Sequence, residues 1–93
     1  MEFNWDDGNR DKSLFRHNVH DWEIEEAFDD PRALPGDTMF VGGEIRETIL
    51  ARCYTSGSYL RIVYTRRARA GQLMIRPISA RHMTAAERAR YSI

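Results

Sequence analysis

Cysteine is almost absent from the chain, since Cys53 is the one cysteine in 93 residues. One cysteine excludes an intrachain disulfide framework and forms no metal site by itself, which is typical of a protein in a reducing cytosolic compartment. We expect Cys53 to be a small buried residue of a strand. A catalytic thiol is disfavoured, because no neighbouring residue in the sequence would lower the pKa of Cys53.

Long apolar runs and phosphate-binding glycine loops are also missing. No segment approaches the ~18 apolar residues of a membrane span, and the first residues are acidic and polar, whereas an export signal is basic and then apolar. The glycines lack the spacing of a nucleotide-binding loop. We therefore expect a cytoplasmic protein without membrane association and without a cofactor.

Metal-ligand spacing is the next absence. The candidate ligands are scattered along the sequence, and no two of them form a known pair spacing. An ordinary metal enzyme thus has little support, and we expect no metal site. The residues considered are His17, His20, Cys53 and His82.

Lysine is scarce as well, because 13 of the 14 basic residues are arginine and Lys12 is the exception. The net charge of zero conceals a division: residues 1–50 carry 13 acidic and 5 basic side chains, whereas residues 51–93 carry 1 and 9. The acidic half can pack beside the basic half, or part of the basic half can face RNA or DNA. Arginine suits either partner, because its planar fork binds carboxylate or phosphate through two hydrogen bonds.

The length predicts a single domain over residues 1–93 with one hydrophobic core. Residues 2–5 alternate between polar and aromatic, which indicates a short half-buried strand. A helix over residues 7–17 should follow, with Asp6 as its N-cap. It should end at Asn18, because asparagine tolerates the left-handed backbone conformation of a helix end.

A second helix is expected from residue 20 or 21 to about Phe28, because Pro31 then disfavours helical backbone in the residue before it. The following chain alternates with period 2, which predicts strands separated by turns. The strands are expected at residues 32–41 (broken at Pro35-Gly36), 44–53, 59–65 and 72–80, with turns at residues 42–43, 55–58 and 66–71.

Consecutive hairpins predict an antiparallel sheet of at least three strands, packed on the two N-terminal helices, and hence an α+β fold. A C-terminal helix should begin at Thr84, because Thr84 and Glu87 have the spacing of a capping box. Pro77 lacks the N–H that a sheet ladder requires, so the last strand must lie at an edge or carry a bulge there.

The strand from Met74 to Arg81 contains the two arginines of most interest. A regular period of 2 puts Arg76 on one face of this strand and Arg81 on the other. One interpretation is a solvated strand edge, since arginine is mostly a surface residue. The other is that guanidinium groups from neighbouring strands converge on one phosphate-sized spot, which would make a binding site.

Short motifs along nearly the whole chain occur in the order found in a known family. The chain resembles the BrnT toxins of bacterial type II toxin–antitoxin pairs, which share the RelE-like fold of small ribonuclease toxins. The most specific block is Ile78-Ser79-Ala80-Arg81. The other matching motifs are Trp5-Asp6, Arg16-His17-Asn18-Val19, Ala27-Phe28-Asp29-Asp30-Pro31, Gly43-Glu44-Ile45-Arg46, Gly57, Val63-Tyr64-Thr65, Arg76-Pro77, and Glu87-Arg88 with Tyr91.

The chain departs from the pattern of this family at four positions. The family usually has Lys at the position of Asn9, Asn at Ser13, Gly at Asn18 and Ile at Pro77. The change at Asn9 removes a positive charge from the expected first helix. Arg10 or Lys12 can supply such a charge from a neighbouring position.

The resemblance implies an endoribonuclease that cleaves mRNA without a metal and so inhibits translation. Such cleavage uses the 2′-hydroxyl of the substrate as nucleophile, and arginine suits the charge that develops on phosphorus. Arg46, Arg76 and Arg81 are then expected to hold the scissile phosphate, with His17 or Glu44 as acid–base candidates. Residues expected to contact RNA elsewhere are Lys12, Arg16 and Arg66, together with Tyr64 and Tyr91 as stacking rings.

Structural interpretations of these residues stay open at the level of sequence. Glu44 and Arg46 can form a cross-strand ion pair, and Tyr64 and Tyr91 can pack in the core. His17 can have a purely structural role at the end of a helix. A non-catalytic alternative is a binding module that pairs with an antitoxin and takes part in operator binding.

The resemblance also implies partners. These are a BrnA-like antitoxin of the ribbon-helix-helix type, the RNA substrate, and operator DNA reached through the antitoxin. Paired heterodimers, that is, a dimer of heterodimers, are the assembly that the family suggests.

Overall fold

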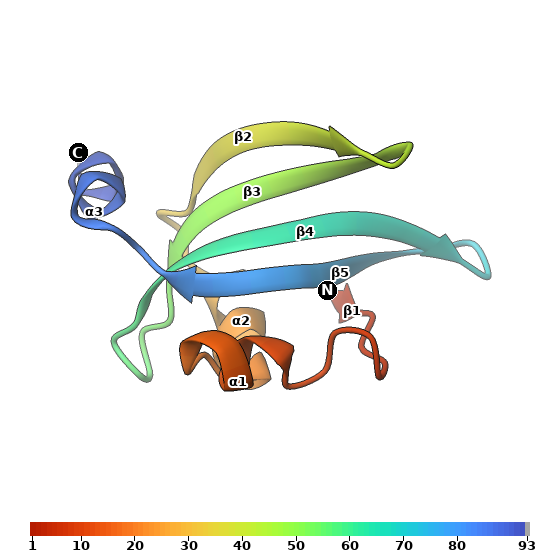
Figure 1. Ribbon diagram of the computed structural model, residues 1–93, viewed down its shortest axis with the longest axis horizontal. Helices are drawn as coiled ribbons and strands as arrows, with labels where there is room; N and C mark the ends of the chain where they lie inside the picture. Colours follow the sequence, from red (N-terminus) through yellow and green to blue (C-terminus); the bar gives the residue numbers. More distant parts are fainter. Residues whose placement is uncertain (93) are drawn as a thin grey trace.

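The computed structural model describes residues 1–92 as an α+β domain with one β-sheet (Figure 1). This is the fold class expected from the sequence. None of the described helices is long and apolar enough to cross a bilayer. The elements in chain order are β1 (Glu2–Phe3), α1 (Lys12–His17), α2 (Asp21–Ala27), β2 (Leu34–Val41), β3 (Glu44–Arg52), β4 (Tyr59–Arg69), β5 (Gln72–His82) and α3 (Ala85–Tyr91).

The sheet has five strands in the order β1-β5-β4-β3-β2. Strands β2 to β5 form a continuous antiparallel meander, in which each strand pairs with the next. Strand β1 adds a short parallel edge, with Glu2 opposite Met74 and Phe3 opposite Ile75. The expected meander is therefore confirmed and extended to four strands, and the parallel edge makes the sheet mixed.

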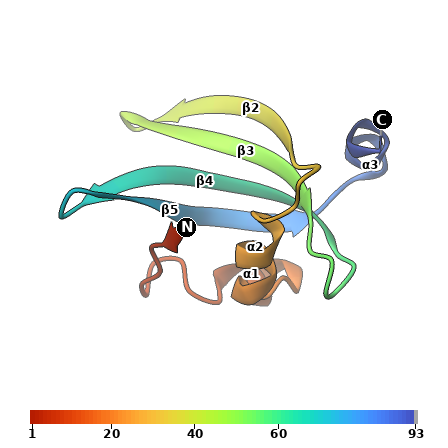
Figure 2. The ribbon, with the colours of Figure 1, turned by 180° about the vertical axis from the view of Figure 1, so that it is seen from behind.

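The helices lie on both sides of this sheet. Helices α1 and α2 cover one face of the sheet, which is called the helix face. Helix α3 lies on the other side, near the end of β5 (Figures 1 and 2). The core lies between helices α1 and α2 and the helix face of the sheet. It includes Val19 and Ile24 with Leu60, Ile62 and Ala80, none more than 1% exposed. The opposite face, called the open face, carries Arg46, Thr48 and Leu50 of β3, Tyr59, Arg61, Val63, Thr65 and Arg67 of β4, and Arg76, Ser79 and Arg81 of β5.

Helix α1 is shorter than expected, because it begins at Lys12 and not near residue 7. Asp11 precedes it with a φ of 59°, in the left-handed region, which separates the helix from the turns before it. Asp6 therefore does not cap α1. The expected end is confirmed, because Asn18 has a φ of 57° and its N–H donates to the carbonyl of Leu14, while the N–H of Val19 donates to that of Ser13.

The expected turn at residues 66–71 is wrong in its length, because β4 continues to Arg69 and β5 begins at Gln72. The hairpin turns at Ala70 and Gly71, which have φ values of 52° and 77°. Positive φ at two successive residues matches the right-handed twist of the flanking strands, so a two-residue turn suffices. Arginines assigned to a loop by sequence thus lie on strand β4.

Strand β5 carries a bulge beside Pro77. Tyr64 of β4 pairs with Pro77, whereas the preceding residue Val63 pairs with Ser79, so Ile78 is the extra residue. The expectation of an edge or a bulge at Pro77 is confirmed. The extra residue reverses the alternation of side chains beyond it.

The predicted opposite orientation of Arg76 and Arg81 is therefore wrong. Ile75 and Pro77 face the helices before the bulge, and Ala80 faces them after it. Arg76 and Arg81 consequently share the open face, which a strand without the bulge would not allow.

The capping box at the start of α3 is confirmed, since Thr84 accepts from the backbone N–H of Glu87 and the Glu87 side chain accepts from that of Thr84. The other end of α3 is held by Tyr91, whose hydroxyl donates to Asp30 at 2.6 Å. Asp30 is only 5% exposed and also accepts from the N–H of Arg32 at 2.9 Å and of Arg52 at 2.8 Å. One carboxylate thus joins the end of α2, strand β3 and helix α3.

We expect Asp30→Asn to lower the free energy of unfolding by about 1–3 kcal/mol, because an amide has one acceptor oxygen where the carboxylate has two and the hydrogen bonds are buried. Urea denaturation measures this change. Asp29→Asn is the matched control, since Asp29 is exposed and should change stability by less than about 0.5 kcal/mol. Equal effects of the two substitutions would contradict the assigned role.

Candidate nucleic-acid interface

The arginines of the open face form two groups along the sheet. Arg81 lies opposite Arg61 in the β4–β5 register, whereas Arg76 lies opposite Thr65. Arg76 and Arg81 are five positions apart on β5, a span of roughly 15 Å at about 3.3 Å per residue. Their guanidiniums also bind different carboxylates, as described below. The expectation that Arg46, Arg76 and Arg81 converge on one phosphate-sized spot is therefore wrong.

The first group, called the Arg81 group, consists of Arg52, Tyr59, Arg61, Arg81, Glu87 and Arg88. At its centre, the guanidinium of Arg81 donates to both carboxylate oxygens of Glu87, at 2.7 and 3.0 Å. Nε of Arg61 lies 3.7 Å from the same carboxylate. These cations, with the N–H of Thr84, lower the pKa of Glu87 to about 2, the bond from Arg81 being the largest cause.

Two further arginines of this group pack on the ring of Tyr59. The guanidinium carbon of Arg88 is 3.6 Å from the ring centre and that of Arg52 is 4.9 Å from it. Within residues 1–92, neither guanidinium has a carboxylate within 4.0 Å. The Nε of Arg52 is buried without a hydrogen-bond partner. The Arg81 group thus has four guanidiniums and a single carboxylate.

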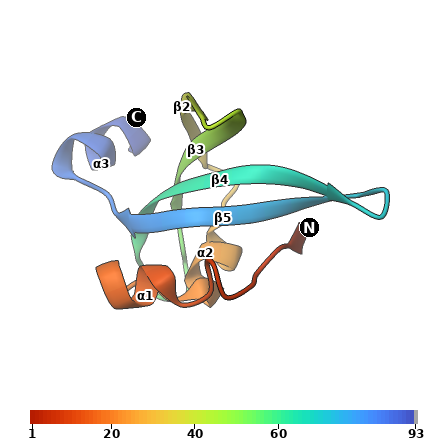
Figure 3. The ribbon, with the colours of Figure 1, turned by 45° about the vertical axis from the view of Figure 1, so that its right-hand side comes forward.

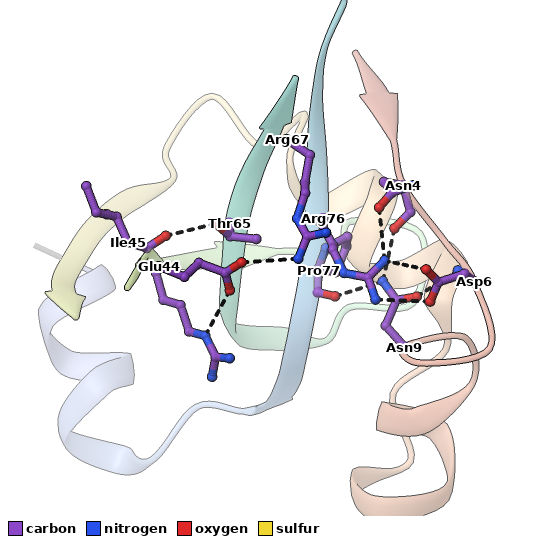
Figure 4. Close-up of polar contacts among 10 residues, drawn as sticks. Asn4, Asp6, Asn9, Glu44, Ile45, Thr65, Arg67, Arg76 and Pro77 are labelled. Atoms are coloured by element: carbon purple, nitrogen blue, oxygen red, sulfur yellow. Dashed lines mark hydrogen bonds and ion pairs between the residues drawn. The ribbon is translucent and has the colours of Figure 1, made fainter. Parts of the chain in front are cut away.

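The second group, called the Arg76 group, consists of Asn4, Asp6, Glu44, Arg46, Arg67 and Arg76 (Figure 4). The guanidinium of Arg76 donates to Asn4 at 2.9 Å and to both oxygens of Asp6 at 3.0 Å. These contacts lower the pKa of the Asp6 carboxyl, with the hydrogen bond from Arg76 as the largest cause. Arg76 is therefore held at the outer edge of β5.

Glu44 supplies the second carboxylate of the Arg76 group. It accepts from Nε of Arg46 at 3.3 Å and from Nη2 of Arg67 at 3.1 Å. The ion pair between Glu44 and Arg46, one of the interpretations open from sequence, is thus present. Three guanidiniums with two carboxylates leave the Arg76 group close to neutral, in contrast to the Arg81 group.

Neither tyrosine expected to stack on RNA bases has an available ring. Tyr64 is 6% exposed and packs edge-on against Phe28 at 5.0 Å between ring centres. Tyr91 is 9% exposed, and burial, followed by its hydrogen bond to Asp30, raises the pKa of its hydroxyl. The expectation of base stacking on Tyr64 or Tyr91 is therefore wrong, and core packing is the correct interpretation.

The remaining candidate residues lie away from the open face. His17, Lys12 and Arg16 belong to α1, which packs under the helix face, and His17 and Arg16 are exposed to solvent. Arg66 projects from the helix face of β4 and pairs with Glu47 at 2.6 Å. These four residues thus lie on the other side of the sheet from the arginines of the open face.

Cys53 is buried, as expected from the sequence, but it follows β3 and is not part of the strand. Burial, followed by its hydrogen bond to Glu26 at 2.7 Å, raises the pKa of the thiol and keeps it protonated. Among residues 1–92, no three side chains of His, Cys, Asp or Glu gather as metal ligands would.

Sequence reasoning missed Arg52, Arg61, Arg67 and Arg88. A signal for Arg61 was present, because it alternates with the apolar residues Leu60 and Ile62 in the most strand-like segment. Arg67 was hidden by the overestimated turn. Arg52 and Arg88 join the site through contacts between β3, β4 and α3, which no local pattern reveals.

An α+β domain that gathers arginines on one face of a sheet is typical of proteins that bind polyanions. The family model of the ribonuclease toxin BrnT, of type II toxin–antitoxin systems, matches residues 5–87 of this chain. The chain therefore belongs to the BrnT family, as the motif order indicated. A comparison with curated proteins found no match. The family consists of ribonuclease toxins, which implies an RNA target and an antitoxin partner.

The ion pair of Glu87 predicts a pH dependence of stability. Because folding lowers the pKa of Glu87 from 4.5 to about 2, the pair stabilises the fold fully above pH 4.5 and loses this effect as the pH falls toward 2. We expect Glu87→Gln to be less stable than the parent chain at pH 6 and to approach it near pH 2. Denaturant titrations at several pH values measure this difference, and a difference independent of pH would contradict the ion pair.

Proposed function

We propose that the open face binds single-stranded RNA and that the Arg81 group holds the scissile phosphate. The observation that carries this proposal is the surplus of positive charge there, four guanidiniums with one carboxylate, at a site where Arg61 and Arg81 are 26% and 34% exposed. A phosphate needs such a surplus, because a group of arginines that is fully balanced by its own carboxylates attracts a new anion only weakly. The Arg76 group then binds the RNA strand farther along β5, away from the scissile phosphate.

The chemistry we propose is metal-independent cleavage by the 2′-hydroxyl of the RNA. Its oxygen bonds to phosphorus, the bond from phosphorus to the 5′ oxygen breaks, and the leaving oxygen takes a proton from solvent. Arg61 and Arg81 stabilise the extra negative charge on the phosphate oxygens. Glu87 accepts the proton of the 2′-hydroxyl.

The low pKa of Glu87 in the resting protein makes it a weak base. A phosphate that binds Arg81 competes with Glu87 for the same fork, and its negative charge lies close to the carboxylate. Both effects raise the pKa of Glu87 toward its ordinary value and free one carboxylate oxygen. Substrate binding therefore produces the base, and Glu44 and His17, the earlier candidates, are not needed for this step.

In the cell, the proposed substrate is mRNA in the cytoplasm, and its cleavage inhibits translation. The proposed partner is a BrnA-like antitoxin of the ribbon-helix-helix type, which would cover the open face and carry the pair to operator DNA as a dimer of heterodimers. Support for these statements comes from family membership and from the basic open face.

Induction of the chain alone in a bacterium, followed by growth and by the length of total mRNA, tests the proposal. We expect growth arrest with shortened transcripts, and we expect Arg81→Ala to reduce cleavage by about 100-fold or more, because one donor to the developing charge is lost. Arg16→Ala is the matched control, since Arg16 is an exposed arginine on α1, and it should retain activity.

Two outcomes of this experiment would overturn the proposal. Full toxicity of Arg81→Ala would remove the Arg81 group from the site. Normal growth and intact transcripts with the parent chain, together with tight antitoxin binding, would indicate the non-catalytic binding module.

Independence from metal predicts that purified protein cleaves RNA equally well with and without EDTA. The reason is that guanidiniums, and not a cation, neutralise the phosphate in the proposed step. Gel analysis of a labelled RNA measures cleavage with and without EDTA, and the expected product ends in a 2′,3′-cyclic phosphate. A fully 2′-deoxy strand should stay intact, because it lacks the nucleophile. Loss of cleavage in EDTA, restored by Mg²⁺, would contradict the mechanism.

A further inference from the structure

Two buried polar side chains from the segment before and within α1 bind the outer edge of β5 on either side of its bulge. Nδ2 of Asn9 donates to the carbonyl of Pro77 at 2.9 Å (Figure 4). The N–H of Ala80 donates to Oγ of Ser13 at 2.9 Å. Asn9 and Ser13 are each 5% exposed. These two contacts are called the bulge clamp.

The spacing of the clamp fits only a bulged strand. In a regular strand, residues whose backbone groups point to the same edge are an even number of positions apart. Pro77 and Ala80 are three positions apart, and both point their backbone groups to the outer edge. Both hydrogen bonds of the clamp can form because Ile78 is an extra residue between Pro77 and Ala80.

Asn9 also fixes the chain that faces this edge. Its Nδ2 donates to the carbonyl of Asn4 at 3.0 Å, and its Oδ1 accepts from the N–H of Asp6 at 2.8 Å. The amide therefore uses two donors and one acceptor inside the protein. Figure 3 shows the segment that leads into α1 running beneath β5.

We infer that Asn9 and Ser13 are positioning residues that keep the bulge at Ile78 and thereby direct Arg81 to the open face. Arg81 lies beyond the bulge, so its orientation depends on where the extra residue sits. If the bulge moves past Arg81 along β5, the side chain turns toward the helix face, away from Arg61 and from the phosphate. The inference rests on the proposed function only where activity is the readout.

The test combines Asn9→Asp with Ser13→Ala. Aspartate keeps the acceptor for Asp6 but loses the donors to Pro77 and Asn4, and alanine removes the acceptor for Ala80. We expect cleavage by this double variant to fall roughly 10- to 100-fold, because a displaced guanidinium misaligns the phosphate. Asn18→Gly is the control, since Asn18 has a positive φ that glycine adopts and lies outside the clamp, and it should keep the parent activity.

A second background separates positioning from general destabilisation. Deletion of Ile78 removes the extra residue, keeps Arg81 opposite Arg61, and restores the alternation without a bulge. In that background the clamp substitutions should lower the cleavage rate less than threefold relative to the deletion variant alone, although they still reduce stability. Equal losses of cleavage in both backgrounds would overturn the inference.

A structural readout keeps the inference testable if the deletion variant fails to fold or if the parent chain proves inactive. In the parent, NMR should show a cross-strand contact between the Hα protons of Ile62 and Ala80, which are partners in the register and form a pair without hydrogen bonds to each other, because the N–H of Ala80 points to the outer edge. We expect this contact to weaken at least twofold in the clamp variant and to persist in Asn18→Gly. An unchanged contact in a folded clamp variant would overturn the inference, whatever the activity.

Discussion

The bulge of β5 is the constraint on which the rest of the site depends. Side chains alternate along a strand, so a single extra residue decides which face every later residue occupies. Pro77 is tolerated in β5 because its backbone groups point to the outer edge, where its missing N–H costs no bond to β4, and the extra residue follows it at Ile78. This local irregularity places Ala80 in the core and Arg81 on the open face, whereas a regular strand would bury the arginine and expose the alanine.

Charge then distinguishes the two ends of the open face. Asp6 and Glu44 nearly neutralise Arg46, Arg67 and Arg76, so that end is a network of ion pairs that holds the N-terminal chain to the sheet. At the other end, the capping box of α3 places Glu87 against Arg81 and Arg61. The same carboxylate therefore starts a helix and occupies the place of an anion. In the proposed mechanism, its displacement by phosphate links substrate binding to proton acceptance.

Much of the fold could be predicted from the sequence because its signals are local. The α3 capping box, the end of α1 at Asn18 and the alternation of β4 each depend on neighbouring residues, and the structure confirms them. The start of α1 could not be predicted, because residues 7–11 form turns that the buried amide of Asn9 holds. The orientation of Arg81 likewise depends on the position of the bulge, which Pro77 indicates only to within a residue or two.

The candidate site was predictable in kind and not in arrangement. Strand patterns indicated basic side chains on the sheet, but the grouping of Arg52 and Arg88 around Tyr59 arises from packing between distant elements. The departure at Asn9 shows the same limit. The sequence suggests a lost charge, whereas the structure shows an amide that both donates and accepts behind the site. A lysine has no acceptor for the N–H of Asp6, so asparagine joins the chain before α1 to the strand that carries the arginines in a way that lysine cannot.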